Sequence, residues 1–198
     1  MAGTTTNYGW TYPTSTDLVK DGATAIQTAI QGADTSLFSI TSGKNVGIPL
    51  IGTTTFTSAS TVNVDNVFSA SFKAYRIKLA LTTAAAPTIR LRVSGADNTS
   101  ALYNYTHWYH DNGGNSGAST FATSQTSWLT RAGFYDFVIQ NPFESLLTVA
   151  TGTYIQATGT INSTGTFGAN YNATTSFTGF SILGTAMTGT VNVYGIKE

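Results

Sequence analysis

The residues that could do chemistry in this chain are few and scattered. His107 and His110 lie close together with Asp111 beside them, and imidazole and carboxylate groups are common zinc ligands. An odd separation places the two histidines on opposite faces of a strand, and no acidic cluster offers further ligands. We therefore expect a partly exposed sheet edge at this point in place of a metal site, and no cofactor.

Acidic residues do not indicate a catalytic pair either. Glycoside cleavage requires two carboxyl groups that flank the scissile bond, and only Asp136 and Glu144 lie close together in the middle of the chain. Aromatic neighbours around Asp136 favour a structural role. Ser, His and Asp are too dispersed to predict a triad, and the glycine-rich residues 111–115 lack the lysine and following helix of a phosphate loop. We expect a protein that is not an enzyme.

An aromatic-rich stretch at 102–109 is the best candidate for ligand binding. On a strand it would present one aromatic face next to the polar residues 111–119, an arrangement typical of sugar recognition, while Trp108 would take the other face. The alternative is that one face belongs to the core and the other to a subunit interface. The candidate glycan contacts are Tyr103, Tyr105, His107 and Tyr109.

Composition excludes several classes of partner. The 198 residues carry a formal net charge of zero and only 9% are charged, so phosphate-rich nucleic acid and anionic membrane surfaces are not expected partners. The chain has no cysteine, which excludes disulfides and thiolate metal sites. The N-terminus does not resemble a secretory signal, and no apolar run approaches the roughly 20 residues that span a bilayer. We expect synthesis in a bacterial cytoplasm and no membrane insertion.

A narrow apolar stripe organises the first part of the chain. Its steps of three and four residues predict a coiled-coil helix within residues 15–43. Such a stripe is too thin to be buried by a lone helix, so we expect trimerisation, with docking on the following domain as the alternative. Isoleucine at both core positions of the heptad repeat favours a coiled coil of three helices. The predicted trimerisation residues are Val19, Ala23, Ile26, Ile30, Ala33, Leu37 and Ile40.

Residues 1–14 are expected to form an extended arm. Tyr8, Trp10 and Tyr12 alternate, which places the three rings on one side of an extended chain. Large rings dominate the energetics of interfaces, so the arm is predicted to anchor the protein in a groove of another protein. The alternative is that the rings pack on the chain's own domain.

Period-two patterns begin near residue 53 and predict a β-domain over residues 48–198. We expect strands at 75–81 and 89–93 joined by a hairpin loop at 84–87, with Arg76, Lys78, Arg90 and Arg92 on a shared face. That face is either solvated or in contact with an acidic neighbouring subunit. Later strands are expected at 134–140, 146–157, 158–166, 177–183 and 190–196, with Gly152 a bulge or bend and residues 111–117 a long loop. Short strands separated by Gly, Asn and Ser turns indicate an antiparallel β-sandwich, most simply a jelly roll.

Residues 7–23, Asn-Tyr-Gly-Trp-Thr-Tyr-Pro-Thr-Ser-Thr-Asp-Leu-Val-Lys-Asp-Gly-Ala, resemble the N-terminal segment of tailed-bacteriophage virion proteins. Residues 179–182 and 189–195 resemble the ends of phage jelly-roll fibre and knob domains, as does 90–92 followed by 97–101. The resemblance implies a trimer, a virion-bound N-terminus and an outward β-domain.

We therefore expect a homotrimeric virion structural protein that meets other virion proteins through its arm. The chain is short for a tail fibre and has no shaft repeats, which favours a capsid (head) fibre or a decoration protein. The alternative is a receptor-binding tail fibre or knob that recognises host surface glycans.

Overall fold

The computed structural model describes residues 3–4, 11–12, 19–39, 48–111, 114–122, 131–158 and 161–197. The chain divides into two compact units, Met1–Pro49 and Leu50–Glu198.

The N-terminal unit contains one helix, α1 (Val19–Ser39), within the range predicted from the apolar stripe. Residues 15–18 and 40–43 of that range lie outside the described residues. Among the described residues, no helix combines the length and the hydrophobicity that crossing a lipid bilayer requires.

The described residues of the expected arm form two short paired strands. β1 (Gly3–Thr4) runs antiparallel to β2 (Thr11–Tyr12), with Gly3 opposite Tyr12 and Thr4 opposite Thr11. The chain therefore reverses between the two strands, and β2 lies beside α1. Threonine suits such pairing because its branched Cβ fits a pleated ribbon.

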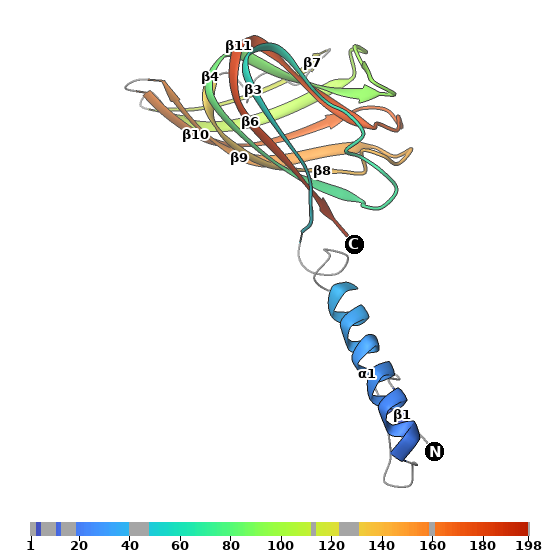
Figure 1. The fold of residues 1–198 in the computed structure, drawn as a ribbon. Helices are drawn as coiled ribbons and strands as arrows, with labels where there is room; N and C mark the ends of the chain where they lie inside the picture. The colour runs from blue at the N-terminus through green and yellow to red at the C-terminus, as the bar shows by residue number, and fades with distance from the viewer. Residues whose placement is uncertain are drawn as a thin grey trace. The chain divides into compact units, whose positions relative to one another are not determined.

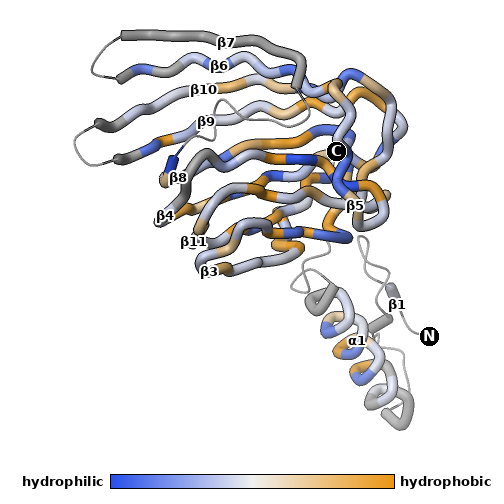
Figure 2. The backbone as a smooth tube through the Cα atoms, turned by 90° about the horizontal axis from the view of Figure 1, so that it is seen from above, coloured by the Kyte–Doolittle hydropathy of each residue, from blue (hydrophilic) through white to orange (hydrophobic). Residues whose placement is uncertain are grey.

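The second unit is a single antiparallel sheet that curls, as Figure 1 shows. Its strands follow the order β3-β11-β4-β8-β9-β10-β6-β7, and β5 pairs with β4. Figure 2 shows these strands side by side from β7 to β3. Their bounds are β3 (Leu50–Val64), β4 (Ala74–Val93), β5 (Ala96–Asp97), β6 (Tyr103–Asp111), β7 (Gly114–Ala122), β8 (Arg131–Gln140), β9 (Thr148–Thr158), β10 (Ile161–Tyr171) and β11 (Gly179–Ile196).

Three long strands, β3, β4 and β11, bend in their middle. The register of β11 shifts against both neighbours between Leu183 and Gly189, and Ser58 and Ala186 have positive φ there. Bulges of this kind bend a strand without ending it. The second half of β4 thus packs over β8. Ile89 of β4 and Phe137 of β8 line a small cavity of about 30 Å³.

This bending corrects several expected boundaries. Residues 75–81 and 89–93 belong to one strand, β4, with no hairpin between them, and the two expected C-terminal strands are likewise one strand, β11. Residues 114–117 lie in β7 where a loop was expected. The mainly β, antiparallel fold is confirmed, whereas the described residues form one curled sheet, so the two separate sheets of a jelly roll are not confirmed.

The core is rich in tyrosine and phenylalanine, and the hydroxyls of three buried tyrosines have hydrogen-bond partners. Tyr75, Tyr103 and Tyr135 are fully buried. Their hydroxyls donate to the carbonyl oxygens of Ser69 at 2.8 Å, Asn98 at 3.0 Å and Arg131 at 2.6 Å, respectively. Buried hydroxyls with partners avoid the cost of desolvation, so large rings can fill the curl of the sheet.

Gly152 is regular in register and not a bulge, which corrects the sequence prediction. It pairs with Phe137 on β8 and with Phe167 on β10. The rings of Phe137 and Phe167 meet edge to face with centroids 5.8 Å apart. A glycine between them leaves the space in which the two rings come together.

Candidate functional site

The predicted glycan platform on β6 is turned into the core. Tyr103 is fully buried, and Tyr105 and His107 are each 6% exposed, while the side chain of Tyr109 lies outside what the structure describes. Tyr103 accepts a hydrogen bond from the Leu91 amide at 3.0 Å. The prediction of a surface platform is therefore wrong for Tyr103, Tyr105 and His107, whose rings fill the curl of the sheet. This was the alternative to a surface platform.

The opposite face of β6 is the exposed one. It carries Asn104, Thr106, Trp108 and His110, and Trp108 is 64% exposed. A surface groove of about 470 Å³ lies against this face, lined from β6 by Asn104 and Thr106. Strands β9 and β10 and the residue before β9 supply its other walls, among them Leu147, Val149, Gly168 and Asn170.

Sequence reasoning missed this groove. Alternation alone could place Asn104 and Thr106 with Trp108 on one face, because they lie two residues apart along a strand. It could not place Asn170 beside Asn104, since that pairing depends on the register of two strands far apart in the sequence.

The two histidines lie on opposite faces, as their odd separation predicts: His107 is buried and His110 is exposed. Burial lowers the pKa of His107 below its ordinary value, because the charged imidazolium loses hydration. Among the described residues, no group of three or more His, Cys, Asp or Glu side chains could hold a metal ion.

The two acidic residues considered for catalysis both form ion pairs. Asp136 receives two hydrogen bonds from Arg76, at 2.7 Å from Nε and 2.5 Å from Nη2. These hydrogen bonds hold the pKa of Asp136 below its ordinary value. Glu144 pairs with Lys73. Both carboxylates thus hold neighbouring segments together.

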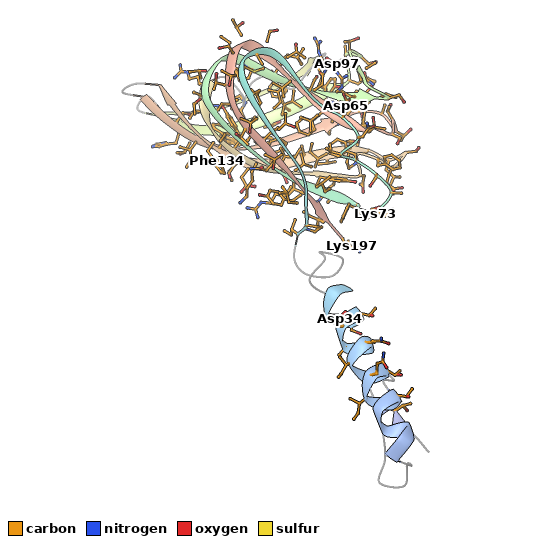
Figure 3. The ribbon with its side chains drawn as sticks, in the orientation of Figure 1. Asp34, Asp65, Lys73, Asp97, Phe134 and Lys197 are labelled. Atoms are coloured by element: carbon orange, nitrogen blue, oxygen red, sulfur yellow. The ribbon has the colours of Figure 1, made fainter. Side chains whose placement is uncertain are left out.

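Arg92 is buried, which corrects the expectation that it shares a solvated face or meets a neighbouring subunit. Its guanidinium lies 2.7 Å from Asp65 and also donates to Asp97, Asn63 and the Gly95 carbonyl. Asp65 and Asp97 lie near one another in the β-unit (Figure 3). The acidic partners of Arg92 therefore come from its own chain.

On α1, two residues of the predicted trimer seam are exposed: Ile26 by 52% and Ile30 by 63%. Ala33 is half-buried. The side chains of Val19, Ala23 and Leu37 and the whole of Ile40 lie outside the described part of the chain, as do Tyr8 and Trp10 of the predicted anchor. Tyr12 is placed in β2 by its backbone.

Comparison with protein-family models, with curated proteins and with solved structures found no match to this chain.

Proposed function

We propose that the protein is a non-enzymatic structural component of a bacteriophage virion, a homotrimeric capsid fibre or decoration protein. The N-terminal unit joins three copies and attaches them to other virion proteins, and the β-unit faces outward. The resemblance of residues 7–23 to phage virion segments supports the virion location.

The exposure of Ile26 and Ile30 on α1 is the observation that carries the proposal. Large apolar side chains one helical turn apart form a continuous stripe. Burying one isoleucine side chain contributes about 1.5–3 kcal/mol, so a three-helix bundle gains stabilisation from two such residues in every copy. Most helical stability in proteins comes from packing of an apolar face, which makes self-association the simplest way to stabilise α1.

The β-unit supports an outward role because its core is complete within one chain. Tyr75, Tyr135 and Phe180 are fully buried, and the exposed side chains of β3 are mainly threonine and serine. Side-chain hydroxyls and amides such as Thr53 and Asn192, 2.7 Å apart, pair across strands. Such a surface stays hydrated without a large net charge.

Immunogold labelling of the phage particle whose genome encodes the chain tests the proposal. Antibody raised against residues 50–198 is expected to label intact heads at regular positions, and deletion of residues 1–49 is expected to abolish labelling. Labelling of lysate proteins but not of particles would contradict the virion role.

A second candidate is a receptor-binding tail fibre or knob that recognises host surface glycans. The glycan site predicted from the sequence is buried, but the exposed Trp108 and the adjacent groove favour this candidate. Labelling at the tail tip in the same experiment would select it.

A further inference from the structure

The groove on the outer face of β6, β10 and β9 is built around a pair of amides. Asn104 lies directly opposite Asn170, and Asn170 lies opposite Val149. Side chains opposite each other in an antiparallel pair have Cβ atoms about 4.5–5.5 Å apart. Two carboxamides, each with a donor and an acceptor group, therefore stand beside one apolar wall.

Gly168 forms the floor of this groove. It lies opposite Thr106 on β6 and Thr151 on β9. A Cβ added at Gly168 would meet nothing within 4 Å, whereas one at Gly165, three residues earlier on β10, would lie 2.5 Å from the Tyr154 ring. The space above Gly168 is therefore open to a ligand.

Trp108 lies on the same face of β6 as the groove, outside the residues that line it. It lies two residues beyond Thr106 on the same face, about 7 Å along the strand, and it is 64% exposed. The indole offers a flat surface on which a ring-shaped ligand can stack, with Thr106 two residues and Asn104 four residues away along the same face of β6.

None of the described residues that line the groove is charged. Its chemistry therefore suits a ligand with many hydroxyls and an apolar face, and does not suit a phosphate or another anion. A volume of about 470 Å³ falls within the range of small-ligand sites. A peptide strand would bind at a sheet edge, whereas β6, β9 and β10 each have strands on both sides.

We propose that Trp108 and this groove bind a neutral oligosaccharide. One sugar ring stacks on the Trp108 indole, and the hydroxyls of a sugar further along the oligosaccharide exchange hydrogen bonds with the amides of Asn104 and Asn170. The inference goes beyond the structural role proposed above and gives the second candidate a site on the face of β6 opposite to the predicted one.

The test is an array of neutral and anionic bacterial glycans probed with the full-length chain. We expect retention on neutral glycans and at least a ten-fold loss of affinity for Trp108→Ala. Gly168→Val, which fills the groove from its floor, is expected to weaken binding similarly while the strand stays folded, because a β-branched residue suits a strand with open space above it. Gly52→Val is the matched control, since a Cβ at Gly52 also meets nothing within 4 Å and Gly52 lies on β3.

Absence of retention on every neutral glycan, or retention that survives both Trp108→Ala and Gly168→Val, would overturn the proposal. Self-association that Trp108→Ala abolishes, without glycan retention, would also overturn it and identify this face as a contact between copies. The array does not depend on particle labelling, so either proposal can fail while the other stands.

Discussion

At the residue scale, glycines in neighbouring strands have opposite roles. Gly152 lies where two core rings meet, and a Cβ there would approach the Phe137 Cβ to 2.3 Å and the Asp136 carbonyl to 2.6 Å. The atoms in the way are largely backbone or close to it, so they cannot move aside. Gly168 faces open space on the outer surface.

We predict that Gly152→Ala lowers the free energy of unfolding by about 3 kcal/mol, the upper end of the range that overpacking of a core typically costs. Gly168→Ala is the control and is expected to leave stability unchanged or slightly raised. Thermal and urea unfolding followed by circular dichroism measure both. Equal stability of the two variants would contradict the packing described around Phe137 and Phe167.

His107 makes stability depend on pH. Because burial lowers its pKa in the folded protein, the unfolded chain takes up a proton below about pH 6.5 that the folded chain does not. The free energy of unfolding should therefore fall as the pH drops from about 6.5 toward the lower folded pKa, and be unaffected by this residue at higher pH. Urea unfolding between about pH 5 and pH 7 measures the slope, at most about 1.4 kcal/mol per pH unit for one proton.

His107→Phe is expected to remove this part of the slope. His110→Phe, on the exposed face of the same strand, is the matched control and should retain it. If His107→Phe keeps the full slope, the buried position of His107 does not control the acid response.

At the scale of elements, Arg92 joins several strands. It contacts Asn63 in β3, Asp97 in β5 and Asp65 just after β3, and Ser181 of β11 donates to Asp97 at 2.9 Å. The side chain of Arg92 is 8% exposed. These polar contacts connect the second half of β4 to β5 and to the neighbouring ends of β3 and β11.

Arg92→Met should lower the free energy of unfolding by about 3–5 kcal/mol, because Asp65 loses the cation it pairs with. Among the described cations, Asp97 keeps only the more distant Arg90, at 3.9 Å. Lys73→Met is the comparison: it breaks a pair whose side chains are 50% and 30% exposed, for which about 0–1 kcal/mol is expected. Chemical denaturation measures the two variants. Equal losses would show that the Arg92 network is energetically no different from a surface pair.

The helix α1 carries a prediction of its own. Replacing both Ile26 and Ile30 with Gln should dissociate the proposed trimer and shift the sedimenting species toward a single chain, because the apolar stripe loses its two exposed isoleucines. Gln27→Ala and Gln31→Ala, off the predicted stripe, should leave the association intact. A double Gln variant that stays associated would exclude α1 as the trimer contact.

The alternation of apolar and polar residues correctly predicted strands in which one face is consistently apolar. Tyr75, Ile77 and Leu79 point into the core as their spacing indicates. The pattern failed where strands bend, because the small residues at 84–87 and the glycines at 184 and 189 resemble turn sequences although the chain continues through them as strand. Local pattern cannot distinguish a bulge, where pairing resumes, from a turn, where it reverses.

The candidate groove lies on the strand on which the glycan contacts were predicted, but on the opposite face. Both faces of β6 carry aromatic residues, and only tertiary packing decides that Tyr103 is buried while Trp108 is exposed. The amide pair of Asn104 and Asn170 comes from a register that no local signal carries.

At the scale of the whole molecule, the chain has two units. The β-unit buries a core of its own, and the helix of the N-terminal unit exposes two isoleucines that we propose contact other copies. The virion role proposed above depends on that contact, since a fibre or decoration protein of this kind acts as an assembled bundle.

The molar mass of the intact chain in solution tests this claim most directly. Sedimentation equilibrium at micromolar concentration should give three times the chain mass of 20.8 kDa, about 62 kDa. A well-folded species of 20.8 kDa at every concentration tested would contradict the proposed trimer and with it the structural role assigned to α1.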